Sequence, residues 1–199
     1  MIKAVLFDYG GVLSSGGKNF RSAVAEILGI EPDQVKTDHV GMHLWDGQVD
    51  AEQFFAELSK QHGKKITAED FSIASRITDK NQKVYNLAAQ LREHGIKTGI
   101  LSNMYKSSAD LLRQKGLYDD FDPIVLSYEE NMSKPNPVFY QHALSMLGCE
   151  PSEVLFIDDQ ERFITPAQKL GIHTVCADTE ERIIVETKAI VQKENGLTL

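Results

Sequence analysis

The stretch VLFDYGGVL, at residues 5–13, joins a short apolar run to a carboxylate and a pair of glycines. Residues 2–7 are apolar apart from Lys3, a pattern typical of a strand buried on both faces of a parallel sheet. Asp8 follows this run directly, at the carboxyl end of the predicted strand. Because ligands bind at that end of a doubly wound sheet, the stretch predicts a functional carboxylate. Gly10, two residues later, offers no second carboxylate beside it.

The composition predicts a globular protein of one domain, or of one domain with a small insertion. The chain has 199 residues, of which 42% are hydrophobic and 25% are charged. A net charge of −8 argues against nucleic-acid or anionic-membrane partners, so an anionic substrate would need local positive groups. Cys149 and Cys176 lack metal-type spacing and are expected to be buried free thiols. Since no signal-peptide pattern or membrane-length apolar run occurs, we expect a cytoplasmic protein.

Apolar runs and helical-period segments alternate along the second part of the chain. Four further strands are predicted, at residues 96–101, 124–126, 154–157 and 173–176. Helical segments precede, separate and follow them, at residues 82–94, 106–116, 137–148, 161–170 and 180–194. This alternation predicts an α/β fold, a doubly wound parallel sheet with helices on both faces.

Residues 15–81 break the alternation, because they have helical apolar spacing and no convincing strand. We expect them to form a helical cap inserted after the first strand and lying over the carboxyl ends of the sheet. The core domain then comprises residues 1–14 and 82–199. Trp45, Phe54 and Phe55 are expected to lie in the core of the cap.

Polar residues follow three of the predicted strands, where strand ends converge on one crevice. They are Asp8, Ser102 and the pair Asp158-Asp159, and Lys134 lies on a proline-bounded loop nearby. Each alone has an ordinary interpretation as a turn, a cap or a solvated side chain. Together, three crowded carboxylates require a cation, and their oxygen ligands suit Mg²⁺.

At these residues the chain resembles the haloacid dehalogenase superfamily of hydrolases, in its phosphatase-like branch, over nearly the full length. Four motifs carry the resemblance, each after its expected element: residues 7–13, 100–103, 133–137 and 155–159. The inserted segment is similar to the small helical cap of that superfamily, including its turn at residues 44–47.

The resemblance implies a nucleophile and a metal site. Asp8 would attack phosphorus and form an aspartyl-phosphate. Asp8, the Gly10 backbone carbonyl and Asp159 would bind Mg²⁺, with Asp158 in a supporting position or bridging through water.

The resemblance also implies a phosphate site with catalytic roles for Ser102 and Lys134. Ser102 and the Asn103 backbone N–H would hold phosphoryl oxygens, and Lys134 would offset charge on the nucleophile and the phosphate. The substrate would be a small phosphate ester.

Gly10 is where the chain departs from the pattern, because phosphatases of the superfamily usually carry an aspartate there as general acid and base. That help is worth about 10²–10⁴ in rate. Three outcomes follow: a slow phosphatase, a substrate with an acidic leaving group such as a sugar 1-phosphate, or a replacement acid. Candidates for the replacement are Tyr9, His39 and His43.

The leading hypothesis is therefore a Mg²⁺-dependent phosphatase of a small metabolite, with a sugar phosphate as one candidate. A 2-haloacid dehalogenase is an alternative, since those enzymes also lack the second aspartate, but they need no metal and no carboxylate pair such as Asp158-Asp159. A catalytically degenerate binding protein is a further alternative. A receiver domain fits poorly, because the insertion after the first strand is too large. Neither the substrate nor the oligomeric state follows from the sequence.

Overall fold

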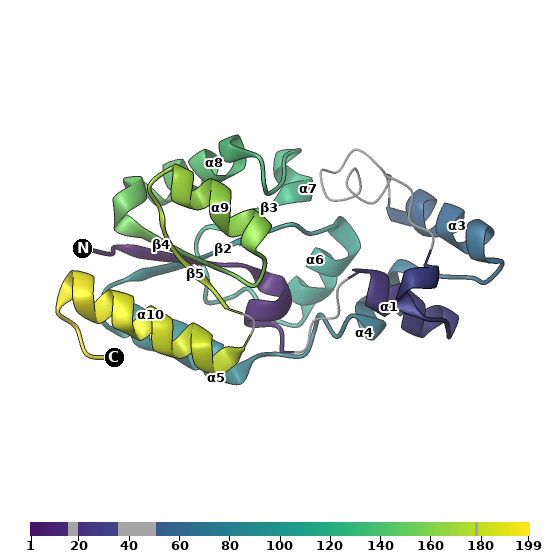
Figure 1. Ribbon diagram of the computed structural model, residues 1–199, viewed down its shortest axis with the longest axis horizontal. Helices are drawn as coiled ribbons and strands as arrows, with labels where there is room; N and C mark the ends of the chain where they lie inside the picture. Colours follow the sequence, from purple (N-terminus) through teal and green to yellow (C-terminus); the bar gives the residue numbers. More distant parts are fainter. Residues whose placement is uncertain (16–19, 36–50, 178) are drawn as a thin grey trace.

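The computed structural model describes residues 1–15, 20–35, 51–177 and 179–199 (Figure 1). Within them, five strands form one sheet in the order β3-β2-β1-β4-β5, and every neighbouring pair is parallel. The strands are β1 (Ala4–Phe7), β2 (Lys97–Ser102), β3 (Ile124–Leu126), β4 (Val154–Asp158) and β5 (His173–Cys176). The predicted doubly wound parallel sheet is confirmed, with strand boundaries within two residues of the expected ones.

Helices cover both faces of the sheet (Figure 1). Val5 and Phe7 of β1 belong to one buried cluster, with residues of α5 (Gln82–Glu93), α6 (Lys106–Gln114) and α10 (Glu180–Asn195). Ala4 and Leu6 belong to the other cluster, with residues of α8 (Pro137–Leu147) and α9 (Glu161–Lys169). Because successive side chains of a strand point to opposite faces, β1 is buried on both, which explains its unbroken apolar run.

Two local elements near the strand ends were not predicted. The chain after β1 makes one wide helical turn at Tyr9–Leu13, in which Gly10 and Gly11 have non-helical backbone angles. A four-residue helix, α7 (Ser127–Glu130), follows β3. Both are too short to show a periodicity of their own, and both direct the chain along the carboxyl edge of the sheet.

The inserted segment consists of helices joined by turns and loops where the structure describes it, with no strand among those residues. Its elements are α1 (Phe20–Leu28), a 3₁₀ turn (Pro32–Gln34), α3 (Ala51–His62) and α4 (Ala68–Ala74). Phe54 and Phe55 are buried in an apolar cluster made of residues of the segment and Tyr105, as expected. His39, His43, residues 44–47 and Trp45 within them lie outside the described residues, and the boundaries of the two domains stay a prediction.

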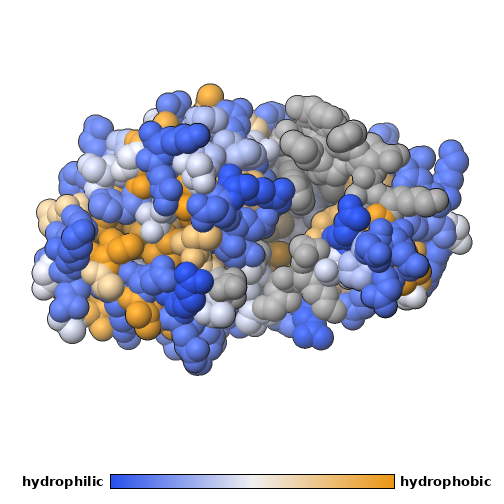
Figure 2. Space-filling view, viewed as in Figure 1, coloured by the Kyte–Doolittle hydropathy of each residue, from blue (hydrophilic) through white to orange (hydrophobic). Residues whose placement is uncertain are grey.

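Strand β5 lies at the edge of the sheet, and most of its side chains are half-buried. Figure 2 shows apolar residues gathered on the surface over this strand and the adjoining side of α10. Cys176 ends β5, and Cys149 lies in the connection between α8 and β4; both are free, as predicted. The expectation that they are buried is wrong, because an edge strand and a loop leave each thiol partly exposed. None of the described helices combines the length and apolarity needed to cross a bilayer.

Candidate active site

The candidate site lies where β1, β2 and β4 end side by side. Asp8 follows β1, Ser102 ends β2, and Asp158 ends β4. Because β1 is flanked by β2 and β4 in the sheet, the nucleophile predicted from the sequence sits between the other two side chains. The Asp8 N–H donates to the Ile157 carbonyl at 2.8 Å, which continues the ladder between β1 and β4 by one residue.

The Asp8 carboxylate is held through one of its two oxygens. Oδ1 accepts a hydrogen bond from Ser102 Oγ at 2.7 Å and lies 2.9 Å from Lys134 Nζ. Among the described residues, no donor contacts Oδ2. Asp8 is 5% exposed, so these two contacts fix the orientation of its carboxylate and leave Oδ2 without a donor among the described residues.

Lys134 is buried between two carboxylates. Its ammonium lies 2.9 Å from Asp8 Oδ1 and 2.6 Å from Asp158 Oδ2, and the residue is 3% exposed. Burial lowers the pKa of Lys134, but the charges of Asp158 and Asp8 outweigh burial and raise the pKa above its usual value. Lys134 is therefore a charged ammonium shared by two buried carboxylates, of whose two negative charges it can neutralise one.

The Asn103 side chain clamps the backbone of Lys134. Its Oδ1 accepts from the Lys134 N–H at 2.9 Å, and its Nδ2 donates to the Lys134 carbonyl at 3.0 Å. Sequence reasoning gave Asn103 a role through its own N–H only and missed this contact. No local pattern could have revealed it, because the partner lies 31 residues along the chain.

The two neighbouring carboxylates of β4 have different surroundings. Asp158 is fully buried, and both oxygens are engaged, Oδ2 by Lys134 and Oδ1 by the Gln160 N–H at 2.9 Å. Burial raises the pKa of Asp158, Lys134 opposes that shift, and Asp8 adds to it. Asp159 is half-buried, and its pKa is raised by burial and by the charge of Asp8. Asp158 thus has the surroundings of a supporting residue, whereas Asp159 keeps oxygens available to a ligand.

A divalent cation fits this donor set. Asp8, Asp158 and Asp159 each offer an oxygen, and these oxygens all lie within 4.8 Å of one another. Lys134 compensates one of the three negative charges, so two remain to be neutralised. Hard oxygen ligands and a deficit of two positive charges match Mg²⁺. The Gly10 carbonyl stays a predicted fourth ligand.

Comparison with known proteins places the chain in a family. A model of haloacid dehalogenase-like hydrolases matches residues 2–171. The chain belongs to that family. YhcW of Bacillus subtilis, named as a phosphatase candidate, is 28% identical over 189 residues, which cover 88% of this chain and 83% of YhcW.

Two further matches define how far the likeness extends. Acyl-CoA dehydrogenase family member 10 of Mus musculus is 33% identical over 103 residues, but these cover 52% of this chain and only 10% of that protein. The solved structure of a HAD family enzyme from Bacteroides thetaiotaomicron, a magnesium complex, has a TM-score of 0.73 and 26% identity, covering 88% of this chain and 93% of that one. The family resemblance expected from the four motifs is confirmed.

Gly10 and Gly11 of the hydrolase, although adjacent, have different steric surroundings. Gly10 has φ −69° and ψ 126°, and a Cβ placed there meets nothing within 4 Å among the described residues. Gly11 has φ +77°, and a Cβ there lies 2.6 Å from Asp159 Oδ2. The turn therefore requires glycine at position 11, where a left-handed backbone lets Asp159 approach closely, but not at position 10.

We expect alanine to have opposite effects at these two glycines. Gly11→Ala should destabilise the hydrolase by about 1–3 kcal/mol, because of the positive φ and the overlap with Asp159. Gly10→Ala should be neutral or stabilise by up to about 1 kcal/mol, because alanine adopts that backbone conformation and restricts the unfolded chain. Urea unfolding of both variants measures the difference. Equal stability of the two variants would contradict the assignment of the tight approach to Gly11.

Tyr9 cannot replace the missing acid. Its side chain is fully buried in the core, and its ring packs edge-on against Tyr118 with 5.4 Å between centroids. Burial raises the pKa of Tyr9 far above its usual value, so its proton is held tightly. Tyr9 is therefore excluded as the replacement acid, because its hydroxyl is enclosed in the core. His39 and His43 lie outside the described residues.

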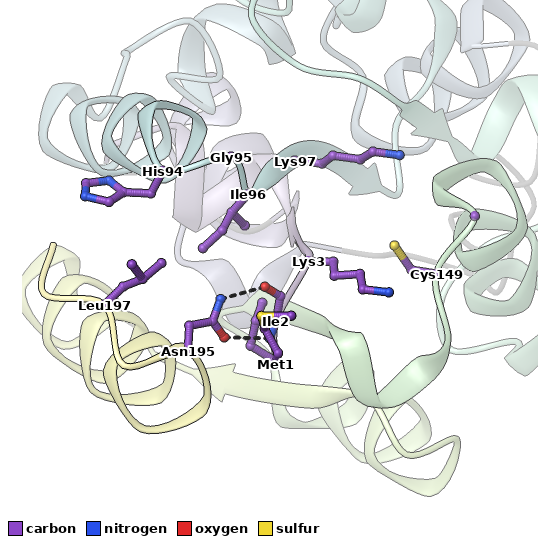
Figure 3. A pocket seen from close by; sticks show the side chains of 11 residues that line it. Met1, Ile2, Lys3, His94, Gly95, Ile96, Lys97, Cys149, Asn195 and Leu197 are labelled. Carbon is purple, nitrogen blue, oxygen red and sulfur yellow. Dashed lines mark hydrogen bonds between the residues drawn. The ribbon is translucent and has the colours of Figure 1, made fainter.

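A surface cavity of about 440 Å³ lies at the opposite edge of the sheet (Figure 3). Residues before β1 and β4 line it, together with residues at the start of β2 and two residues at the end of the chain, Asn195 of α10 and Leu197. Several of its polar groups already have partners: the Asn195 amide exchanges two hydrogen bonds with the Ile2 backbone, and Lys97 Nζ donates to the Leu147 carbonyl. The carboxylate cluster of the hydrolase thus lies at the carboxyl edge, away from this cavity.

Proposed function

We propose that the protein is a Mg²⁺-dependent phosphatase of a small phosphorylated metabolite, with Asp8 as the nucleophile. The observation that carries the proposal is the Asp8 carboxylate, held by Ser102 and Lys134 through Oδ1 and lying within 4.8 Å of the donor atoms of two further carboxylates. The name of YhcW and the magnesium complex of the Bacteroides enzyme support it. A cytoplasmic location and the absence of nucleic-acid partners belong to the same proposal.

In the first step, Asp8 Oδ2 attacks the phosphorus of the ester. The bond between phosphorus and the ester oxygen breaks, its electron pair leaves with that oxygen, and the oxygen takes up a proton to become an alcohol. Water then attacks the phosphorus of the aspartyl-phosphate, which releases inorganic phosphate and a proton and restores Asp8. Lys134, the Ser102 hydroxyl and the Asn103 N–H offset the negative charge on the phosphoryl oxygens.

The metal would be held by Asp8, Asp159 and the Gly10 carbonyl, with Asp158 supporting Lys134. When bound, Mg²⁺ would supply Lewis-acid stabilisation of the phosphoryl charge. Lys134 already supplies one positive charge beside Asp8. Together, Lys134 and Ser102 hold the Asp8 carboxylate in place before any ligand binds.

The proposed enzyme lacks a side chain at position 10 that could protonate the leaving oxygen. Without that acid, esters with a poor leaving group should react with a barrier higher by roughly 3–5 kcal/mol. Esters of acidic alcohols and phenols depend less on an acid. We therefore propose a substrate with an acidic leaving group, and a sugar 1-phosphate is one such compound.

A panel of metabolite phosphates, assayed with Mg²⁺ and with EDTA, tests the function. We expect hydrolysis of an aryl phosphate and of sugar 1-phosphates with Mg²⁺, slower hydrolysis of primary alkyl phosphates, and no hydrolysis in EDTA. Release of chloride from 2-chloropropionate without metal would instead identify a dehalogenase. Binding of a phosphate ester with no turnover of any compound would support the degenerate binding protein and overturn the phosphatase.

A further inference from the structure

We propose that Gln160 and Arg162 form a positioning pair that orients the Asp159 carboxylate for Mg²⁺. Gln160 Nε2 donates to Asp159 Oδ1 at 3.4 Å, and the Gln160 N–H donates to Asp158 Oδ1 at 2.9 Å. One residue thus contacts both carboxylates at the end of β4. The inference rests on the proposed function, because it concerns the metal that function requires.

Arg162 determines which way the Gln160 amide faces. Its Nε and Nη2 both donate to Gln160 Oε1, at 3.0 and 2.7 Å. An amide whose oxygen is fixed by two donors must direct its NH₂ group the other way, here toward Asp159. The Arg162 guanidinium also lies over the Phe163 ring, 4.6 Å from its centroid, and both residues belong to the first turn of α9. The Arg162 side chain is therefore held against α9 by its contact with Phe163.

Asp159 needs such a contact more than its neighbours do. Asp8 and Asp158 are both oriented by the Lys134 ammonium, whereas the ion pairs among the described residues include none with Asp159. A half-buried carboxylate without a cation keeps rotational freedom, which it would lose on binding a metal. The Gln160 amide removes part of that freedom in advance. Groups that orient metal ligands in this way typically change affinity by 10–100-fold when removed.

The sign of the Arg162 effect separates positioning from plain electrostatics. Arg162 is a cation near a cation site, so removing its charge would strengthen Mg²⁺ binding if only the Coulomb interaction mattered. If Arg162 acts by fixing Gln160, its removal weakens Mg²⁺ binding instead. The two explanations predict opposite changes for the same substitution.

Mg²⁺ titrations of the full-length protein, followed by the backbone NMR signals of residues around Asp159, test the pair. We expect the Mg²⁺ Kd to rise about tenfold in Gln160→Ala and several-fold in Arg162→Ala. The double variant should bind no more weakly than Gln160→Ala, because Arg162 acts only through Gln160. Lys169→Ala is the matched control: it removes an exposed positive charge from the other end of α9 and should leave the Kd unchanged.

Without metal, the melting temperature should change little in any of the variants, since Arg162 is exposed and Gln160 is only half-buried. On adding Mg²⁺, the melting temperature should rise less in the two single variants than in wild type. An unchanged or lower Kd in Arg162→Ala, or additive effects in the double variant, would overturn the positioning pair and leave the phosphatase proposal standing. A wild-type protein that shows no Mg²⁺-dependent signal would overturn both.

Discussion

Asp8→Asn is expected to abolish Mg²⁺-dependent hydrolysis of an aryl phosphate, with a loss of roughly 10³-fold or more in kcat. An amide oxygen does not attack phosphorus to form a stable acyl phosphate, so the covalent route closes. Asparagine has the same shape as aspartate, and its oxygen can still accept from Ser102 and Lys134. The loss should therefore come from chemistry and not from a rearranged site.

The folding of this variant is itself informative. Lys134 keeps its contact with Asp158 at 2.6 Å, so the buried ammonium retains one carboxylate partner when Asp8 becomes neutral. We expect thermal unfolding to show a folded protein. Asp120→Asn provides the control, since this aspartate is 67% exposed, and its activity should equal that of wild type. Wild-type activity in Asp8→Asn would show that the nucleophile has been misassigned.

Gly10→Asp is expected to raise kcat/KM for poorly activated alkyl phosphates by about 10²–10⁴, while the rate for an aryl phosphate changes little. The new carboxyl group can protonate the leaving oxygen, which an alkyl ester needs and a phenyl ester largely does not. The structure accommodates the change, because the backbone at Gly10 suits an L-residue and a Cβ there meets nothing within 4 Å among the described residues. The ratio of the two kcat/KM values measures the effect.

Gly10→Asn separates proton transfer from side-chain size. Asparagine fills almost the same volume as aspartate but has no acidic proton, so it should give no gain. A folded Gly10→Asp variant with an unchanged ratio would mean that the missing acid does not limit the reaction. An equal gain in both variants would point to the side-chain volume instead.

The sheet could be predicted from the sequence because short apolar runs alternate with helical-period segments, and β1, β3 and β4 are unbroken apolar runs that lead into polar residues. A parallel strand that is buried on both faces needs apolar side chains at every position. Val5 and Leu6 illustrate this, because they pack on opposite faces of the sheet. The convergence of Asp8, Ser102 and Asp158 then follows from topology alone, since adjacent parallel strands end at one edge. The role of Lys134 could be predicted only from the resemblance of residues 133–137 to a family motif, because without that resemblance a buried lysine looks like a solvated one.

Side-chain direction was the part that could not be predicted. Asn103 directs its amide to the peptide of Lys134, and Gln160 directs its amide to Asp159 because Arg162 holds the other end. These orientations depend on partners brought close by folding, so no periodicity or spacing encodes them. The wide turn after Asp8 was missed for a related reason, since its shape comes from two glycines with different backbone angles.

The place of Tyr105 has a consequence for modular engineering of this fold. Tyr105 belongs to the segment that follows Ser102 and Asn103, yet its ring packs against Phe55 and Phe71 of the inserted helices, with centroids 6.0 and 5.7 Å away. Ser108 Oγ, in α6, also lies 3.0 Å from Ser72 Oγ in α4. The inserted helices therefore cannot be exchanged alone. A chimera that received the helices of a relative would have to exchange Tyr105 and Ser108 with them, or leave an aromatic ring without its packing partners next to Ser102 and Asn103.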